Sequence, residues 1–222
     1  MSGPQPAKGR PQRIVLEGRY TRLEPLGPQH AADLYRAATE PGAEGRFRYL
    51  FEEAPADAAD MAAYVRRAMA ADDPLLFAVI DRATGQADGR QALMRIVPEH
   101  GAIEIGSIYW GPRMARSRIA TEALYLHARY VFDELGYRRF EWKCNDRNAP
   151  SRRAALRFGF AFEGIFRQHM IQKGENRDTA WFAMLDRDWP AIRAEYERWL
   201  DPRNFDADGQ QRTPLRVPPA SA

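Results

Sequence analysis

Cysteine is nearly absent from this chain, which holds one, Cys144, among 222 residues. A single thiol cannot form an internal disulfide, and this excludes the class of small secreted domains held together by disulfides. Histidine is also scarce, with four residues, and no group of cysteines and histidines has the spacing of a zinc site. The sequence therefore predicts a protein of the reducing cytoplasm that carries no metal.

Long hydrophobic runs are missing as well. No stretch of about 20 residues, the length of a membrane-spanning helix, is free of charged side chains. The beginning of the chain, MSGPQPAKGRPQR, has no apolar segment of the kind that a secretory signal needs. The formal net charge of +3 is too small for the concentrated basic face of a nucleic-acid-binding protein. We therefore expect neither a membrane nor a nucleic acid among the partners.

Residues 13–200 carry periodic apolar patterns, and we interpret them as one domain. The segments 1–12 and 201–222 are rich in proline or polar residues, and we expect them to be flexible tails. Within the domain, short apolar runs and alternating patterns between turn residues predict strands. They lie at residues 13–26 (two short strands), 75–82, 90–112 (a hairpin turned at PEHG), 137–144, 160–172 and 177–185.

Helices are predicted where apolar residues recur at helical spacing, at residues 27–40, from about 57, 119–135, 148–159 and 186–200. Asn148 and Asp188 are placed to cap two of them, and Gly136 to end another. The helix between strands 102–110 and 137–144 indicates a parallel crossover. The expected fold class is α/β, with a mixed, mostly antiparallel sheet, one parallel strand pair and helices on both faces.

The segment GPRMARSRIATEAL, residues 111–124, joins a predicted strand to a predicted helix. Helix starts present unpaired N–H groups and a partial positive charge, and anions bind there for that reason. Arg113, Arg116 and Arg118 add guanidinium groups, which can bind phosphate in a bidentate manner. The segment is therefore a candidate pyrophosphate grip, and a solvated basic turn is the alternative.

Other phosphate and hydrolase motifs are missing. The chain has no Walker loop, no dinucleotide-binding G-x-G-x-x-G after its first strand, no G-x-S-x-G elbow and no H-E-x-x-H. The function must therefore be sought in the context of the loop.

That context resembles the GCN5-related N-acetyltransferases, in particular the branch that acetylates the N-termini of ribosomal proteins. The family's loop reads Q/R-x-x-G-x-G/A at the start of a helix, and in this branch T-E-A commonly follows. Here the loop reads RMARSR, followed by Ile119, Ala120 and the TEA of residues 121–123. Arg113 matches the leading position, whereas Arg116 and Arg118 stand where the family has glycine and glycine or alanine.

A second stretch, residues 143–168, resembles the same branch in its ordered pattern of Asn, Ser, L-x-x-G-F and E-G. The matching residues are Asn148, Ser151, Leu156, Gly159, Phe160, Glu163 and Gly164, followed later by Gly174, Asp178 and Trp189. The element order is similar to the family's fold over roughly residues 14–200.

The resemblance implies acetyl-CoA as cosubstrate, bound between strands 102–110 and 137–144. The backbone of Ile108, Tyr109 and Trp110 would receive the pantetheine arm and the thioester carbonyl, whose oxygen becomes more negative in the transition state. The implied cofactor-binding residues are completed by Arg113, Arg116, Ser117, Arg118, Ile119, Ala120, Thr121, Asn148 and Ser151. Ile119, Ala120 and Thr121 open the helix that would meet the pyrophosphate.

Acetyl transfer to an amine requires that the amine lose a proton and that the CoA thiolate gain one. Ser151 matches the branch's serine near the CoA sulfur and is the candidate proton donor. The branch commonly has a glutamate base after E-G, but Met170 stands at that position. Glu104 is then the candidate base, and His169 is expected to face the opposite side of its strand from Met170.

The resemblance predicts an N-acetyltransferase that acts on a primary amine, either a protein N-terminus or a small molecule, by direct attack in a ternary complex. A non-catalytic acyl-CoA-binding or regulatory protein is the alternative. A nucleic-acid-binding role for the loop arginines with Arg138 and Arg139 is disfavoured by the even mix of acidic residues. Glu52 and Glu53 are candidates for attracting a cationic acceptor, and the sequence leaves a homodimer open.

Overall fold

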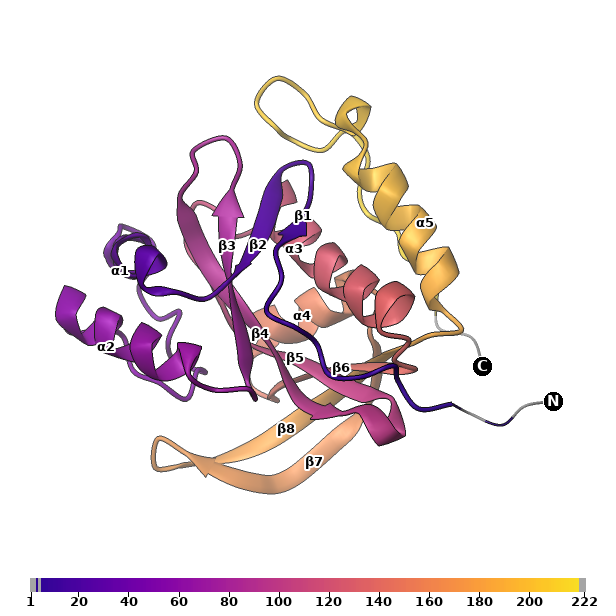
Figure 1. Ribbon diagram of the computed structural model, residues 1–222, viewed down its shortest axis with the longest axis horizontal. Coiled ribbons are helices and arrows are strands. Elements are labelled where there is room, and N and C mark those ends of the chain that lie inside the picture. The colour runs from indigo at the N-terminus through magenta and orange to yellow at the C-terminus, as the bar shows by residue number, and fades with distance from the viewer. Residues whose placement is uncertain (1–2, 4, 220–222) are drawn as a thin grey trace. The chain divides into compact units, whose positions relative to one another are not determined.

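The computed structural model describes residue 3 and residues 5–219, and its elements follow the predicted order (Figure 1). The strands are β1 (Leu16–Glu17), β2 (Thr21–Pro25), β3 (Leu75–Asp81), β4 (Ala87–Val97), β5 (Ala102–Trp110), β6 (Arg139–Asn145), β7 (Ala161–Gln172) and β8 (Glu175–Leu185). The α-helices are α1 (Ala31–Thr39), α2 (Ala58–Met69), α3 (Arg118–Arg129), α4 (Ala149–Arg157) and α5 (Trp189–Leu200). Short helical turns are η1 (Pro28–His30), η2 (Pro98–His100), η3 (Tyr130–Glu134) and η4 (Pro202–Asn204).

Hydrogen bonding orders the strands β1-β2-β3-β4-β5-β6-β8-β7. The pair β5–β6 is parallel, and the pairs β1–β2, β2–β3, β3–β4, β6–β8 and β7–β8 are antiparallel. The predicted mixed, mostly antiparallel sheet with one parallel pair is therefore confirmed.

The chain divides into two compact units, and each is described by itself. The loop unit comprises Pro11–Met94 and Gly106–His127, and so contains the arginine loop. The hairpin unit comprises Met1–Arg10, Arg95–Ile105 and Ala128–Ala222, and so contains the β7–β8 hairpin. The single domain over residues 13–200 remains a prediction.

In the loop unit, helices cover both faces of strands β2 to β4 (Figure 1). On one face, α1 and α2 pack against alternate strand residues such as Leu76, Ala78 and Ile80. On the other, α3 brings His127 edge-on to Phe77, with ring centroids 4.8 Å apart. The period-two pattern of β3 thus sends its apolar side chains into two cores, as expected for a strand that is covered on both sides.

His127 is fully buried in this second core, where the Gln91 amide lies 2.9 Å from its Nδ1. Its Nε2 is buried without a hydrogen-bond partner among the residues that the structure describes. Burial therefore lowers the pKa of His127 to about 3, because a charged imidazole would lose its hydration there.

This burial makes the stability of the fold depend on pH. The pKa of an unfolded histidine is near 6.5, so below that pH the unfolded chain binds a proton at this histidine and the folded chain does not. The folded state therefore loses stability as the pH falls. We expect His127 to cost about 2 kcal/mol of unfolding free energy between pH 7 and pH 5. Urea unfolding of the wild type and of His127→Leu at both pH values measures this term. Equal losses in the two proteins would contradict the assignment.

In the hairpin unit, one face of β6 and β8 is aromatic. Phe140 packs tilted on Phe160 with ring centroids 5.6 Å apart, and Trp142 lies 6.1 Å from Phe158. The Tyr196 hydroxyl of α5 donates to the Phe158 carbonyl at 3.0 Å, which ties α5 to the end of α4. The alternate residues of β6, Glu141 and Lys143, face the other way and carry charge, as the sequence alternation predicts.

Helix ends agree with the sequence in part. Asn148 caps α4, because its Oδ1 accepts from the Ser151 amide at 3.2 Å. Asp188 is the N-cap residue of α5, at the predicted position, but its side chain makes no capping hydrogen bond. The predicted helix 119–135 is α-helical only to Arg129 and continues as the wider π-type turn η3 before the left-handed Gly136.

Both predicted tails make packing contacts that their composition did not indicate. The Ala7 and Lys8 amides donate to the carbonyls of Pro98 and Leu135, each at 2.9 Å. Beyond α5, Phe205 is buried with its ring 5.0 Å from that of Trp199. Residues 1–2, 4 and 220–222 of these tails lie outside the described residues.

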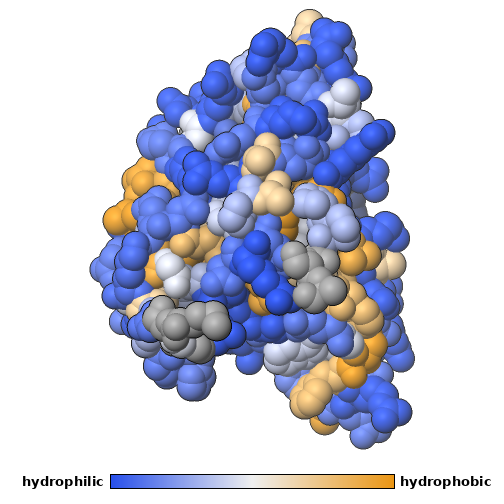
Figure 2. All heavy atoms as spheres, turned by 90° about the vertical axis from the view of Figure 1, so that its right-hand side faces the viewer, coloured by the Kyte–Doolittle hydropathy of each residue, from blue (hydrophilic) through white to orange (hydrophobic). Residues whose placement is uncertain are grey.

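The molecular face in Figure 2 is mainly hydrophilic, with small apolar areas between the polar ones. Over residues 3 and 5–219, no helix has the length and apolar composition needed to cross a membrane.

Candidate active site

The arginine loop is closed onto α3 by Ser117, which acts as the N-cap. Its Oγ accepts from the Ile119 amide at 3.1 Å and donates to the Met114 carbonyl at 2.6 Å. The Ser117 carbonyl also accepts from the Thr121 amide at 3.4 Å. This is the usual reason for a serine just before a helix, and it holds the loop against the helix start.

Arg116 has a φ of +64°, the left-handed conformation that glycine adopts easily and other residues rarely. It stands at the position where the sequence comparison places a glycine. Arg116 therefore has the backbone conformation of a glycine, which costs a residue with a side chain roughly 1–2 kcal/mol of conformational free energy. The amides of Arg116 and Ala120 have no hydrogen-bond partner within the described part of the chain. They are donors that an anion can use.

The three loop arginines differ in what their side chains contact. Arg113 Nε lies 3.1 Å from a Glu40 carboxylate oxygen, and its Nη1 donates to Gln86 at 3.0 Å. The guanidinium of Arg118 lies over the Tyr20 ring, 4.3 Å from its centroid. The exposed side chain of Arg116 contacts no polar group of residues 3 and 5–219, so it can turn towards a bound anion without losing a partner.

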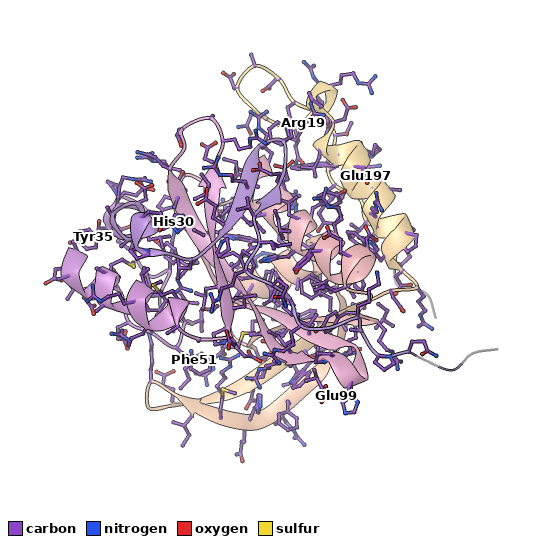
Figure 3. The ribbon with its side chains drawn as sticks, in the orientation of Figure 1. Arg19, His30, Tyr35, Phe51, Glu99 and Glu197 are labelled. Atoms are coloured by element: carbon purple, nitrogen blue, oxygen red, sulfur yellow. The ribbon has the colours of Figure 1, made fainter. Side chains whose placement is uncertain are left out.

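A surface pocket of about 710 Å³ adjoins this helix start. Arg118, Ile119 and Arg19 are among the residues that line it. Arg19 lies in the turn between β1 and β2 (Figure 3). The turn itself is tied to α3 by Glu122, the middle residue of the TEA segment. Its carboxylate accepts from the amides of Arg19, Tyr20 and Thr21 at 2.6–2.8 Å. Glu122 thus has a structural role that sequence analysis did not assign.

The last residues of β5 turn their side chains into the loop unit. The Tyr109 hydroxyl donates to the Ala37 carbonyl at 2.7 Å, and burial raises the pKa of Tyr109 to about 12. The Trp110 indole donates to Gln91 at 3.2 Å. Ile108 is half-buried. The side chains of Tyr109 and Trp110 are thus engaged in packing, and a role in ligand binding falls to the backbone of this stretch.

In the hairpin unit, Glu104 lies in a buried network of charges. One of its carboxylate oxygens is 2.9 Å from Lys143 Nζ and 3.0 Å from Arg95 Nε. Lys143 also contacts Glu141 at 2.6 Å and lies over the Trp181 ring, 3.9 Å from its centroid. Burial raises the pKa of Glu104, and the attraction of Lys143 offsets part of that rise. A carboxylate with a raised pKa is better suited to accept a proton near neutral pH.

Ser151, on the first turn of α4, has a hydroxyl with defined neighbours. Its Oγ accepts from the Trp142 indole at 3.0 Å. Burial raises the pKa of the Cys144 thiol, and a hydrogen bond with Ser151 offsets part of this. Because a hydroxyl hydrogen rotates freely, Ser151 can keep the indole contact and donate its proton to another acceptor.

The family model of the acetyltransferase (GNAT) domain matches residues 21–161, well over half of the chain. The chain belongs to the GNAT acetyltransferase family.

Solved GNAT structures cover nearly all of this enzyme. A GCN5-related N-acetyltransferase from Brucella melitensis is 57% identical with a TM-score of 0.92, over 95% of this chain and 96% of that one. A probable GNAT acetyltransferase from Chromobacterium violaceum is 38% identical with a TM-score of 0.78, over 86% and 95%. The N-acetyltransferase YnaD of Bacillus subtilis is 28% identical over 53% of this chain and 68% of its own length.

The fold is also shared with the microcin C7 self-immunity acetyltransferase MccE, solved in complex with acetyl-CoA and AMP. That protein is 20% identical with a TM-score of 0.65, over 76% of this chain and 93% of its own. At this identity the likeness concerns the fold alone.

The predicted site residues of this GNAT enzyme fall into two groups. The loop unit contains Ile108, Tyr109, Trp110, Arg113, Arg116, Ser117, Arg118, Ile119, Ala120 and Thr121. The hairpin unit contains Asn148 at the N-cap of α4, Ser151 on α4 and Glu104 on β5. Among residues 3 and 5–219, no three histidine, cysteine, aspartate or glutamate side chains are grouped as metal ligands.

His169 does not follow the alternation that the sequence predicts. β7 shifts register between Phe166 and Met170, and Gln168 within the shift has a φ of +49°. A bulge of this kind breaks the two-residue period. The His169 Nδ1 consequently lies 2.9 Å from Thr179 Oγ1, and its ring is 6.2 Å from that of Trp181. It therefore lies on the face that carries Lys143, where burial and nearby cations lower the pKa of His169.

Proposed function

We propose that this GNAT acetyltransferase transfers the acetyl group of acetyl-CoA to a primary amine, by direct attack in a ternary complex. The acceptor is a protein N-terminal α-amine or a small-molecule amine. The observation that carries the proposal is the loop at the start of α3, with its Ser117 cap, left-handed Arg116 and unused amides. Such donors bind a pyrophosphate, and family membership supplies acetyl-CoA as its source.

The cosubstrate has a partner in the chain for each of its parts. The amides at the start of α3, with the Arg116 guanidinium, hold the pyrophosphate. The backbone of Ile108–Trp110 meets the pantetheine arm and the thioester carbonyl, and Asn148 adds a polar contact to that arm. The side-chain packing of Tyr109 and Trp110 supports this assignment, because it fixes the backbone that carries those groups.

The reaction then moves two protons. The amine nitrogen attacks the thioester carbonyl carbon, the C–S bond breaks, and the acetyl group ends on nitrogen. Glu104 receives the proton that the amine loses, directly or through a water. Ser151 donates a proton to the departing CoA thiolate. The raised pKa of Glu104 and the freely rotating hydroxyl of Ser151 support these roles.

The acceptor that we favour is an α-amine. Its ordinary pKa is about 7.7–8.0 against about 10.4 for lysine, so a useful fraction is neutral near pH 7. The resemblance of residues 143–168 to the ribosomal-protein branch points the same way. We place the reaction in the cytoplasm, since one cysteine in 222 residues suits a reducing compartment.

Calorimetric titration with acetyl-CoA tests the loop. We expect Arg116→Ala to weaken binding about tenfold, because one charge-assisted contact contributes roughly 1.5 kcal/mol. Arg116→Gly also lacks the guanidinium but adopts the left-handed path without cost, so it should bind more tightly than Arg116→Ala. Arg113→Ala and Arg118→Ala should lose less, because those side chains already have partners.

Four outcomes of this titration are decisive. A wild-type protein that does not bind acetyl-CoA would refute the proposed function. An equal loss of affinity in the two Arg116 variants would assign the contribution of Arg116 to its guanidinium, and wild-type affinity in both would assign the grip to the backbone amides. Tight binding without acetyl transfer to any of a panel of peptides and small amines would favour the non-catalytic acyl-CoA-binding alternative.

A further inference from the structure

Arg90, on β4 in the loop unit, is a buried charge whose guanidinium contacts Ser107, Glu52 and Tyr64. Its side chain is 3% exposed. Its Nη1 donates to Ser107 twice, to the carbonyl oxygen at 2.5 Å and to Oγ at 2.7 Å. The other end of the guanidinium contacts the Glu52 carboxylate, and its face lies over the Tyr64 ring, 4.7 Å from the centroid.

Ser107, the residue that Arg90 binds, has a backbone conformation that is unusual in a strand. Ser107, in the middle of β5, has a φ of +49°. Residues other than glycine rarely adopt this conformation, and they keep it only where their surroundings enforce it. Here the two bonds from Arg90 fix the carbonyl and the side chain of Ser107 together, and the Tyr64 hydroxyl adds a third.

The arrangement costs free energy of folding, because it includes both a buried charge and a strained backbone. Burial lowers the pKa of Arg90 to about 9, so the guanidinium is still charged at neutral pH. A buried charge needs a compensating partner, and Glu52 supplies one from the segment between α1 and α2. An apolar residue at position 90 with glycine at position 107 would avoid both the buried charge and the backbone strain. Strain of this kind is concentrated at functional sites, where it directs neighbouring groups.

The groups that follow Ser107 are the peptide units of Ile108, Tyr109 and Trp110. We propose that Arg90 is a positioning residue for acetyl transfer: by holding Ser107 left-handed, it sets the direction in which these peptide units meet the thioester. The inference rests on the proposed function, because that function assigns the thioester to this stretch. It adds a residue that contacts neither substrate and acts through the backbone of β5.

Glycine rescue provides the test. Arg90→Met removes the two bonds to Ser107, and we expect kcat to fall about 100-fold, the usual effect of misaligned transition-state donors. Adding Ser107→Gly in the same chain allows a positive φ without enforcement. We expect the kcat of the double variant to be at least tenfold higher than that of Arg90→Met. The control Arg177→Met removes a buried arginine of the hairpin unit and should lower the melting temperature without affecting acetyl-CoA binding.

A second readout keeps the test independent of turnover. The Cα and Cβ chemical shifts of Ser107 report the sign of φ, and they should leave the left-handed range in Arg90→Met. Unchanged shifts, or a double variant no faster than Arg90→Met, would overturn the proposal. If Arg90→Met does not fold, Tyr64→Phe removes one bond to Ser107, and unchanged shifts there together with an unchanged kcat would count against it. A wild type that acetylates no amine refutes the proposed function, while the shifts still decide whether Arg90 holds Ser107.

Discussion

Replacing Glu104 with glutamine is expected to lower kcat/KM for the amine by a factor of about 10²–10⁴, the usual contribution of a general base. Glutamine has nearly the same shape and keeps an oxygen for Lys143, 2.9 Å away in the wild type. The fold should therefore survive while the proton acceptor is lost. Steady-state rates at saturating acetyl-CoA measure the effect.

The pH profile separates loss of a base from loss of packing. Burial raises the pKa of Glu104, so the wild type loses its base as the pH falls through that raised value. Protonation of the amine substrate lowers the rate over the same range. The logarithm of the wild-type rate should therefore rise with a slope approaching 2 at low pH, and with a slope of 1 in Glu104→Gln.

Glu141→Gln is the matched control for Glu104. Glu141 contacts the same Lys143 at 2.6 Å and lies opposite Glu104 on the neighbouring strand β6, but Arg139 also binds it. Burial opposes ionisation of Glu141, but the combined hydrogen bonds and charges of Arg139 and Lys143 outweigh it and lower the pKa of Glu141, which makes it a weak base. Its variant should keep most of the activity. A Glu104→Gln enzyme with the rate and pH slope of the wild type would remove Glu104 from the mechanism.

Replacing Ser151 with alanine is expected to reduce kcat about 100-fold and to leave acetyl-CoA binding nearly unchanged. The hydroxyl acts only when the CoA thiolate departs, so its loss affects the transition state more than the bound substrate. The helix cap is not disturbed, because Asn148 accepts from the Ser151 backbone amide, which alanine retains. Single-turnover rates together with calorimetric dissociation constants distinguish the two effects.

The Trp142 indole provides the control for Ser151. In Ser151→Ala the buried indole N–H loses its acceptor, at a cost of about 1–3 kcal/mol in stability. Adding Trp142→Phe removes the unpaired donor and should restore much of the stability without restoring kcat. If activity returned together with stability, Ser151 would be a packing residue, and the proton would reach the thiolate from elsewhere.

The arginine loop shows how far local pattern carries a prediction. A helix start, a serine cap and a basic cluster are all readable from residues 111–124, because capping and helix polarity depend on neighbours in the chain. The sequence does not show which of the three arginine side chains is available to bind an anion. Arg113 is engaged by Glu40 and Arg118 by Tyr20, and both partners come from distant segments that only folding brings near.

The alternation of β7 failed at His169 for a related reason. A strand's two-residue period is a local rule, and it holds for β6, where Glu141 and Lys143 share one face. A bulge depends on how the partner strand fits, and the β7–β8 register shift rotates the chain before Met170.

The order of strands and helices, the parallel β5–β6 crossover, the Asn148 cap and the family could be predicted from the residues alone, because these follow from periodicity, turn chemistry and ordered motifs. The chemistry of single groups depends on contacts that form only when the chain folds. The sequence does not predict that Lys143 lies against Glu104. It also gives no reason for the charge of Arg90 in an apolar strand, and the structure supplies one, the contact with Ser107. The pKa of a carboxylate and the φ of a strained serine depend on burial and on partners far along the chain, which no local pattern records.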